Sequence, residues 1–515
     1  MTSATDPASA PGLPPGMSRL HPARLHQLPA GVRRPAYDRA RLAPGIVHLG
    51  IGAFHRAHQA AVTDLAIAAS GDLRWGIVGV SLRSPDTRDA LAPQDGLYTV
   101  ALRDARGEAL HVVGAVLRVL VAAEDPVAVL DQIAHPDTRI VSLTVTEKGY
   151  CHEPASGRLR WDDPDIVHDL AHPEAPRSAI GTLVHGLHRR YAAGQGPLTL
   201  LSCDNLPANG DTLRGLVLAY AQRLDTGLRA WIADRCTFPN SMVDRIVPRT
   251  GDDDRARIAA TLGMADAWPV VGEPFMEWVI EDRFAAGRPA WDQPGAARFV
   301  AEAAPFERLK LRMVNGPQST LAYLGAMAGL ATNNEAVADP DLRRFVDAMM
   351  RLEAAPTLGE VLGVDLDDFR ARLLARVANP ALPHRTQQVA MDGSQKVPQR
   401  LLDPLRQRLA AGQGCDRLAL AVAAWLHYLR GVDELGAAYP IRDPLADTLT
   451  RLHAQAESAG PADPASAAAR LAAAFTAHAP VFGDLGAHAG FVRAVARGLE
   501  ALRRDGVRAT ARRWA

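Results

Sequence analysis

Lysine is almost missing from this chain of 515 residues: among its 57 positively charged side chains only Lys148, Lys310 and Lys396 are lysine, and every other one is arginine. On an exposed surface the two cations replace each other at little cost. Arginine cannot replace an amine that must lose its proton, because the pKa of a guanidinium stays above about 12. The three lysines are therefore candidates for sites that need an ammonium group, with chance as the alternative.

Cysteine is also scarce, and neither sign of charge is in excess. The four cysteines are scattered and form no Cys-x-x-Cys pair, which argues against a structural zinc or a disulfide framework and favours a reducing cytoplasm. The formal net charge is zero, whereas nucleic-acid binders normally carry a basic surplus or a basic face. We therefore expect a cytoplasmic protein that binds no nucleic acid.

Long apolar runs are missing as well. No stretch of about 18 apolar residues occurs, so we expect no membrane-spanning helix. The first 17 residues are rich in Pro, Ala and Ser and lack the apolar centre of a signal peptide. We interpret residues 1–40 as a disordered or extended tail.

What is present indicates an α/β protein of two domains, the number expected for a chain of this length. Strand-like runs alternate with helical stretches between residues 41 and 295, which is typical of a Rossmann-type domain with a largely parallel sheet. We expect strands at 46–49, 75–82, 97–102, 112–121, 140–145 and 198–203. Ala/Leu/Arg-rich helical patterns predict a mainly α-helical domain over 296–515, in which the poorly periodic stretch 381–400 is expected to be a loop.

A glycine turn follows the first expected strand and begins a helical pattern, as in dinucleotide-binding folds, where the backbone approaches the pyrophosphate at a helix N-terminus. The expected cofactor-binding residues of this turn are Gly50, Ile51, Gly52, Ala53 and Phe54. His55 stands where a third glycine is usual, so a tight turn without a ligand is the alternative. His55 and His58 would also suit a metal, but packing is favoured and we expect no metal.

The end of the second expected strand bears on the choice of cofactor. Asp86 would bind the ribose of NAD, whereas Arg83 would favour the 2′-phosphate of NADP. We expect NAD, and NADP stays open.

Two further segments carry polar side chains suited to alcohol oxidation. Asn205 follows a buried strand in Ser-Cys-Asp-Asn-Leu-Pro and would donate a hydrogen bond to a developing alkoxide, with an Asx turn as the alternative. On a helix after residue 306, Glu307, Lys310, Asn315 and Gln318 fall on one side. Burial would lower the pKa of the lysine toward neutrality and make it a general acid/base. An ordinary surface helix face is the alternative, and Pro317 is expected to kink the helix or limit its regular part.

Several long motifs resemble the long-chain mannitol dehydrogenase family, which includes mannitol 2-dehydrogenases, other polyol dehydrogenases and fructuronate reductases (mannonate oxidoreductases). The resemblance covers roughly residues 40 to 490, and the motifs that carry it are GIGAFHRAHQ, SLTVTEKGY, LSCDNLPANG, FPNSMVDRIVP, EPFMEWVIEDRF, KLRMVNGPQSTLAYLG and AMDGSQKVPQR. The resemblance implies a Rossmann-type domain, a helical domain, a site between them and no catalytic metal.

The resemblance also implies roles for particular residues. Lys310 would be the general acid/base, Asn205 and Asn315 would hold the oxyanion, and Glu307 would gate proton exchange. The substrate-side residues implied or expected are Val243, Asp244, Lys396 and Arg385. Thr146 and Glu147, in the TEKGY motif, are expected at the cofactor.

Two departures from the family pattern concern the substrate. Gln318 stands where the family has a histidine that contacts substrate, and glutamine neither carries charge nor titrates near neutral pH. Gln388 stands where mannitol-preferring members tend to have arginine, which places this chain nearer the fructuronate-reductase branch.

The resulting hypothesis is an NAD-dependent reductase of D-fructuronate to D-mannonate, working as a monomer or a small homo-oligomer. A polyol dehydrogenase of the mannitol/fructose or arabinitol type is the alternative. A non-catalytic ligand sensor on the same fold is a minor alternative. Gln318, in place of the family histidine, is compatible with it, whereas the titratable Lys310 argues against it.

Overall fold

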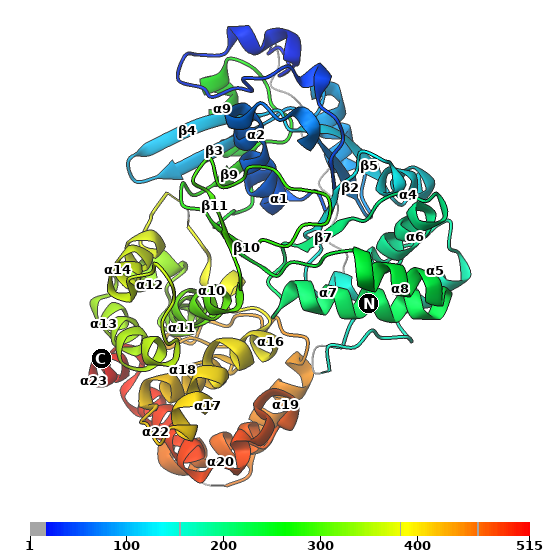
Figure 1. The fold of residues 1–515 in the computed structure, drawn as a ribbon. Coiled ribbons are helices and arrows are strands. Elements are labelled where there is room, and N and C mark those ends of the chain that lie inside the picture. The colour runs from blue at the N-terminus through cyan, green and yellow to red at the C-terminus, as the bar shows by residue number, and fades with distance from the viewer. Residues whose placement is uncertain (1–16, 154–155, 382, 461–462) are drawn as a thin grey trace. The chain divides into compact units, whose positions relative to one another are not determined.

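The computed structural model describes residues 17–153, 156–381, 383–460 and 463–515, and the chain divides into two compact units, Met1–Ala304 and Pro305–Ala515 (Figure 1). Part of the expected tail, residues 1–16, lies outside the described residues. Residues 17–40 contribute buried side chains, among them Leu20 and Leu28, and the backbone N–H of Leu20 donates to the carbonyl of Ala265 at 2.9 Å.

The first unit contains the parallel sheet that the sequence predicts. Its five strands lie in the order β5-β2-β1-β6-β7, and all four neighbouring pairs are parallel. The strands are β1 (Ile46–Leu49), β2 (Ile77–Ser81), β5 (Val116–Val121), β6 (Ile140–Leu143) and β7 (Thr199–Ser202). Val47 and Leu49 belong to one apolar core and Ile46 to another, because successive side chains of a strand point to opposite faces. The Rossmann-type fold is therefore confirmed.

Helices connect these strands and cover both faces of the sheet. They are α1 (Ala53–Ala57), α2 (Gln59–Ser70), α3 (Asp86–Leu91), α4 (Pro126–Ala134), α5 (Pro164–Ala171), α6 (Ala179–Ala192), α7 (Asn209–Leu224) and α8 (Thr226–Arg235).

Two three-stranded sheets accompany the central one and contain the antiparallel pairs of the described chain. One has the order β4-β3-β9 and the other the order β11-β10-β8. Their strands are β3 (Tyr98–Asp104), β4 (Gly107–Val113), β8 (Ser241–Asp244), β9 (Val270–Gly272), β10 (Glu277–Glu281) and β11 (Ala297–Val300). The single strand expected over 112–121 is wrong, because the chain leaves one sheet at Val113 and enters another at Val116. Gly114 marks the break: its N–H donates to the carboxylate of Asp64 at 2.7 Å.

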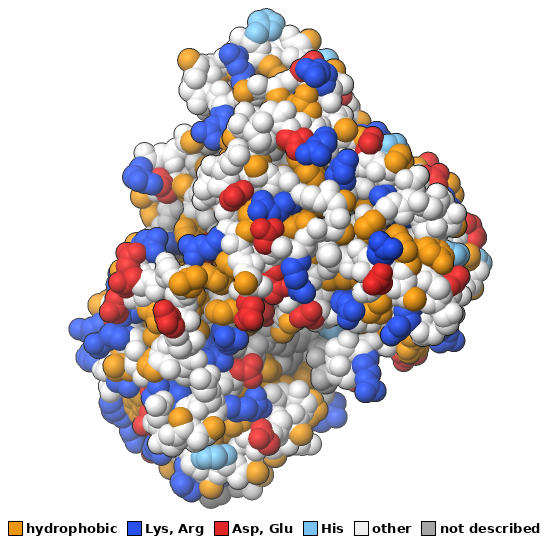
Figure 2. All heavy atoms as spheres, viewed as in Figure 1, with side chains coloured by type: hydrophobic (Ala, Val, Ile, Leu, Met, Phe, Trp, Pro, Cys, Tyr) orange, Lys and Arg blue, Asp and Glu red, His pale blue; other side chains and the backbone are white. Residues whose placement is uncertain are grey.

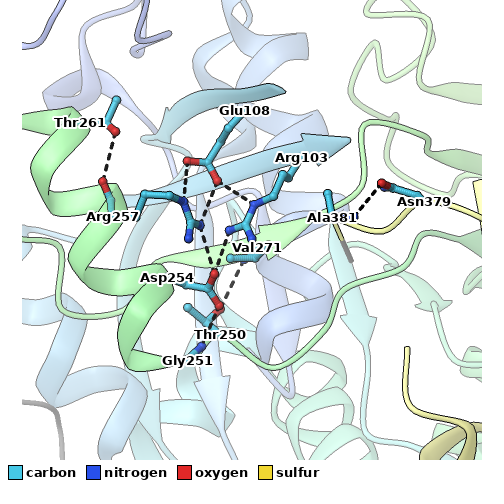
Figure 3. A network of polar contacts seen from close by, with 10 residues as sticks. All are labelled: Arg103, Glu108, Thr250, Gly251, Asp254, Arg257, Thr261, Val271, Asn379 and Ala381. Atoms are coloured by element: carbon cyan, nitrogen blue, oxygen red, sulfur yellow. Dashed lines mark hydrogen bonds and ion pairs between the residues drawn. The ribbon is translucent and has the colours of Figure 1, made fainter. Parts of the chain in front are cut away.

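An ion-pair network joins the β3-β4 hairpin to helix α9 (Asp252–Leu262), as Figure 3 shows. Arg103 pairs with Glu108 at 3.0 Å and with Asp254 at 2.8 Å, and Arg257 pairs with the same two carboxylates, each at 3.0 Å. The two arginines and two carboxylates alternate, so each charge has two partners of opposite sign. The network fixes the hairpin and contains none of the predicted site residues.

The second unit is mainly α-helical, which confirms the second half of the fold prediction. Its helices are α10 (Ala304–Leu309), η6 (Lys310–Asn315), α11 (Gly316–Met327), α12 (Asn333–Ala338), α13 (Pro340–Met349), η7 (Met350–Ala354), η8 (Ala355–Thr357), α14 (Leu366–Val377), α15 (Thr386–Val389), α16 (Gly393–Val397), η9 (Pro398–Leu402), α17 (Asp403–Ala410), α18 (Asp416–Tyr428), α19 (Ala446–Ser458), α20 (Pro464–Thr476), α21 (Ala479–Phe482), η10 (Gly483–Ala487), α22 (Ala489–Asp505) and α23 (Val507–Trp514). The loop expected over 381–400 is wrong in part, since α15, α16 and the start of η9 occupy it. These helices are too short to show a 3.6-residue period in the sequence.

Charged side chains of both signs are interspersed on the face of the protein that Figure 2 shows, in keeping with the formal net charge of zero. None of the helices in the described part of the chain is long and apolar enough to cross a membrane.

Candidate active site

The strand order of the central sheet indicates a ligand site at the carboxyl ends of its strands. The connections run outward in opposite directions from β1 and β6, and ligands in such sheets lie beyond the carboxyl ends of the strands where the order reverses. The turn Gly50–Phe54 follows β1, and residues Thr144–Glu147 follow β6. The structure therefore brings both predicted cofactor-binding segments to the switch point of the sheet.

The two glycines of the turn have different roles. Gly50 has a φ of +89°, and a Cβ on it would lie 2.2 Å from the carbonyl oxygen of Thr144, so only glycine fits. Gly52 is exposed, and a Cβ there would meet only the Gly50 oxygen, at 3.9 Å. The space above Gly52 is open and lies directly before helix α1, which suits the pyrophosphate of a dinucleotide.

His55, which replaces the third glycine, is part of a buried packing arrangement. Its ring stacks on that of His48 with the centroids 3.3 Å apart. His48 in turn places Nδ1 2.8 Å from the hydroxyl of Ser142 and Nε2 2.8 Å from that of Thr144. Burial lowers the pKa of His48 to about 3, so the ring is neutral. The Thr144 hydroxyl also donates to the Gly50 carbonyl at 2.8 Å, so this network holds the backbone of the glycine turn in place.

The end of β2 borders a cavity of about 520 Å³, in the size range of ligand pockets. Leu82 and Arg83 from the end of β2 line it together with Ala122 from the end of β5. The Arg83 side chain is 89% exposed and lies 4.0 Å from Asp165. Asp86 begins helix α3 on the same connection. Both residues that bear on the choice between NAD and NADP thus follow β2, and Arg83 lines the cavity.

The residues after β6 and β7 form a second polar group at the same edge of the sheet. Thr146, Glu147 and Lys148 are exposed in the turn after β6. Asn205 is exposed in the turn after β7, directly after Asp204. The carboxylate of Asp204 accepts hydrogen bonds from the backbone of the β6 turn.

Val243 and Asp244, the predicted substrate-side pair, end strand β8 and are buried. The side-chain amide of Asn209 donates to the carbonyl of Ser241 at 2.8 Å and to that of Asp204 at 3.1 Å. This amide therefore fixes the start of β8 next to the segment that carries Asn205.

In the second unit, Lys310 begins a π-helix, η6 (Lys310–Asn315), that interrupts the α-helical pattern predicted from the sequence. Hydrogen bonds in a π-helix join residues five apart, as the N–H of Gly316 and the carbonyl of Leu311 do here. Asn315, five residues after Lys310, therefore lies one turn above it. The α-helical spacing used in the prediction separates the two more widely, and π-turns are frequent at functional sites.

Burial distinguishes this helix from an ordinary surface face. Lys310 is 7% exposed and Gln318 is 8% exposed, while Glu307 and Asn315 are half-buried. Pro317 lies in the first turn of α11, directly after the π-turn, which agrees with its expected effect on the regular helix.

Lys396, which is predicted to contact the substrate, belongs to a helical segment that packs on η6. Lys396 is half-buried on α16, which continues into η9, and η9 packs on η6. A Cβ on Gly316 would lie 3.0 Å from the carbonyl oxygen of Arg400, which marks the close approach of η9. The Arg400 guanidinium donates to the hydroxyl of Ser319 at 3.0 Å, next to Gln318.

Arg385 is exposed and precedes helix α15, which packs on α11. Two neighbours that the sequence reasoning missed support this region. Asn333 donates from its side-chain amide to the Gln318 carbonyl at 3.0 Å, and its backbone N–H donates to the carbonyl of His384. Burial, and secondly the charge of Lys396, lower the pKa of His384. An isolated antiparallel β-bridge joins Thr332 to Arg385, and no pattern in the sequence predicted that these two positions pair.

Comparison with known proteins gives a consistent result over nearly the whole chain. The model of the mannitol dehydrogenase Rossmann domain matches residues 44–293, and that of the mannitol dehydrogenase C-terminal domain matches residues 302–503. The uncharacterized oxidoreductase YdfI of Escherichia coli (strain K12) is 47% identical over 82% of this chain and 87% of its own length. D-mannonate oxidoreductase of the same organism is 46% identical over 83% of this chain and 88% of its own length.

A solved structure agrees with these relatives. The ternary complex of Pseudomonas fluorescens mannitol 2-dehydrogenase with NAD and D-mannitol superposes with a TM-score of 0.86 at 39% identity, covering 96% of this chain and 99% of that one. Both domain models, the relatives and the fold lead to one conclusion: the chain belongs to the mannitol dehydrogenase family of oxidoreductases.

Proposed function

We propose that this chain is an NAD-dependent dehydrogenase that interconverts a secondary alcohol and a ketone of a sugar acid, with D-mannonate and D-fructuronate as the expected pair. The observation that carries the proposal is a buried amine, Lys310, at the start of a π-turn that ends at Asn315. A non-catalytic binding site has no need of a buried group that titrates.

Lys310 is the general acid/base of the proposed reaction. A buried amine loses the hydration that favours its ammonium form, so the neutral base becomes accessible. The neutral amine takes the proton of the substrate hydroxyl, and in the reverse direction the ammonium returns it to the forming alkoxide. Such proton transfer contributes about 10²–10⁴-fold to the rate.

Two asparagines and one glutamate complete the proposed machinery. Asn205 and Asn315 donate amide hydrogen bonds to the substrate oxygen, which carries negative charge in both directions of the reaction. Glu307, one turn before Lys310 on α10, exchanges the proton of the lysine with solvent; its half-buried position supports this role.

NAD fits the residues at the switch point of the first unit. The open space above Gly52 accepts the pyrophosphate, and the cavity bordered by Arg83 accepts the adenosine end. The turn with Thr146 and Glu147 follows β6 at the same switch point. Val243 and Asp244, at the end of β8, serve the substrate side. When bound, NAD supplies the acceptor for the hydride of the alcohol carbon.

Three cations near the helix of Gln318 support a carboxylate substrate. Lys396 and Arg400 lie on the helical segment that packs on η6, and Arg385 directly precedes the helix that packs on α11. The similarity to D-mannonate oxidoreductase agrees with this assignment. Mannitol 2-dehydrogenase, of which the solved relative is an example, supports a neutral polyol as the second candidate.

A substrate matrix tests the proposal. Purified protein is mixed with NADH or NADPH and with fructuronate, tagaturonate or fructose, and the reduced-cofactor absorbance is followed. We expect kcat/KM for NADH with fructuronate to exceed that with fructose by at least tenfold. A preference for fructose would establish the polyol alternative, and ligand binding without turnover of any substrate would establish the sensor.

Exchange of Gln318 for the family histidine is expected to change the pH dependence. An imidazole titrates and glutamine does not, so Gln318→His should add an ionisation to the profile of kcat/KM. We expect it below about pH 6.5, because position 318 is buried and burial disfavours the imidazolium. Gln399→His, on η9, is the control. An identical pH profile and identical substrate preference in Gln318→His would show that position 318 does not touch the substrate.

A further inference from the structure

Asp204 is a buried carboxylate that joins the ends of two neighbouring strands. Cys203 continues the pairing of β6 and β7, because its N–H donates to the carbonyl of Leu143 at 2.9 Å. Directly after it, the Asp204 carboxylate accepts from the backbone N–H of Val145 at 3.0 Å and of Thr146 at 2.9 Å. One side chain thus holds the turn after β6 to the turn after β7.

The turn that Asp204 holds is strained. Thr146 has φ +63° and ψ 166°, a region that is almost confined to glycine and costs roughly 1–3 kcal/mol for other residues. Such a conformation persists only where its surroundings enforce it. The two backbone bonds to Asp204 enforce it here, and the hydroxyl of Tyr150 adds a third bond to the same carboxylate at 2.8 Å.

The segment on the other side of Asp204 is fixed as well. The side-chain amide of Asn209 donates to the Asp204 carbonyl at 3.1 Å, and Ala208 has a φ of +42°. Asn205 stands between these two anchors. Its backbone position is therefore set by the carboxylate of Asp204 on one side and by the amide of Asn209 on the other.

We propose that Asp204 is a positioning residue: its carboxylate holds the strained Thr146 turn on the cofactor side and, through the same bonds, sets Asn205 for the substrate oxygen. The inference rests on the proposed function, in which Asn205 and Thr146 serve substrate and cofactor. Asp204 acts through these two residues.

The chemistry of the carboxylate supports a positioning role over simple packing. The three donors to Asp204 are two backbone amides and a phenol, all neutral. Burial raises the pKa of Asp204 to about 6, so keeping it ionised at neutral pH costs stability. An ionised oxygen pair is the group that accepts from two adjacent N–H groups at once, and that is what the strained turn requires.

The test compares Asp204→Asn, Thr146→Gly and the double variant with the full-length wild type. Asparagine keeps the shape but puts an NH₂ group opposite one of the backbone donors. We expect Asp204→Asn to lower kcat by about 10–100-fold, the range for hydrogen bonds to a charged group, and to weaken NADH binding several-fold. In the double variant glycine adopts the native φ without a steric cost, so NADH affinity and part of kcat return.

Controls separate positioning from stability. Asp234→Asn changes an exposed aspartate, 77% exposed, whose ion pair is with the adjacent Arg235, and should leave all readings unchanged. Tyr150→Phe removes the hydroxyl that bonds to both Asp204 and Ser202 but leaves the two backbone bonds to Asp204 in place, so it should give a smaller loss than Asp204→Asn. A lower Tm in Asp204→Asn with unchanged kcat and NADH affinity would overturn the inference, and so would a double variant no better than Asp204→Asn.

The same proteins distinguish this inference from the proposed function. If the wild type turns over none of the candidate substrates, the proposed function fails, and the inference is then judged by the NADH dissociation constant from fluorescence titration. In that case Asp204→Asn must weaken NADH binding, and the addition of Thr146→Gly in the double variant must restore it. Wild-type NADH affinity in Asp204→Asn overturns the inference.

Discussion

Lys310→Ala is expected to lower kcat by about 10²–10⁴-fold while the dissociation constant of NADH changes by less than about twofold. The amine is the group that moves the substrate proton, and the residues expected to bind NAD belong to the other compact unit of the chain. Steady-state turnover of fructuronate and fluorescence titration of NADH measure the two quantities. Turnover within threefold of the wild type would refute the mechanism.

Companion variants identify which property of the lysine matters. Lys310→Met keeps the bulk of a side chain that is 7% exposed, so it controls for lost packing. Lys310→Arg keeps the positive charge, but a guanidinium does not give up its proton; we expect it to be as inactive as Lys310→Met. Arg308→Ala, exposed two residues earlier, is the matched control with wild-type turnover. High activity in Lys310→Arg would indicate electrostatic binding in place of acid/base catalysis.

Gly52→Ala is expected to weaken NADH binding by at least about tenfold, or about 1.4 kcal/mol, without lowering Tm. A Cβ on Gly52 meets only the Gly50 oxygen at 3.9 Å, so the protein accommodates it. The methyl group would instead occupy the open space that the pyrophosphate needs. NADH titration and thermal unfolding of the same sample give both values.

Gly50→Ala is the contrasting variant, because we expect it to lower the stability of the folded protein. With φ at +89° and a Cβ 2.2 Å from the Thr144 carbonyl, alanine forces the turn to move. We expect a fall in Tm of several degrees together with loss of NADH binding. If Gly52→Ala binds NADH as the wild type does, the turn is only a tight connection between strand and helix.

Regular patterns in the sequence predicted the framework well. The strands β1, β2, β6 and β7 are short apolar runs buried on both faces, so local composition alone reveals them. The single strand expected over 112–121 was wrong because apolar residues continue on both sides of Gly114. At the change of sheet, Gly114 bonds to the carboxylate of Asp64, far away in the sequence. The helices within 381–400 were missed because four or five residues are too few to establish a period.

Some residues of the candidate site could likewise be predicted from the sequence, and others could not. Residue types and long motifs singled out Lys310, Asn205 and Asn315, since few side chains can transfer a proton or stabilise an oxyanion. Asp204 stands beside Asn205 in the same motif, yet its role has no sequence signal, because it depends on a strand that is adjacent in the sheet and about sixty residues earlier in the chain, at Val145 and Thr146.

The sequence by itself determined the kind of protein: scarce lysine, the glycine turn and the motif order indicate the family and the chemistry, because these depend on residue identity and local spacing. Only the tertiary structure decided how the groups are presented. The π-turn that begins at Lys310 and ends at Asn315 replaces the α-helical spacing that the sequence suggested. The strain at Thr146 exists only because two parallel strands end side by side, and long-range hydrogen bonds of this kind leave no periodic trace in a sequence.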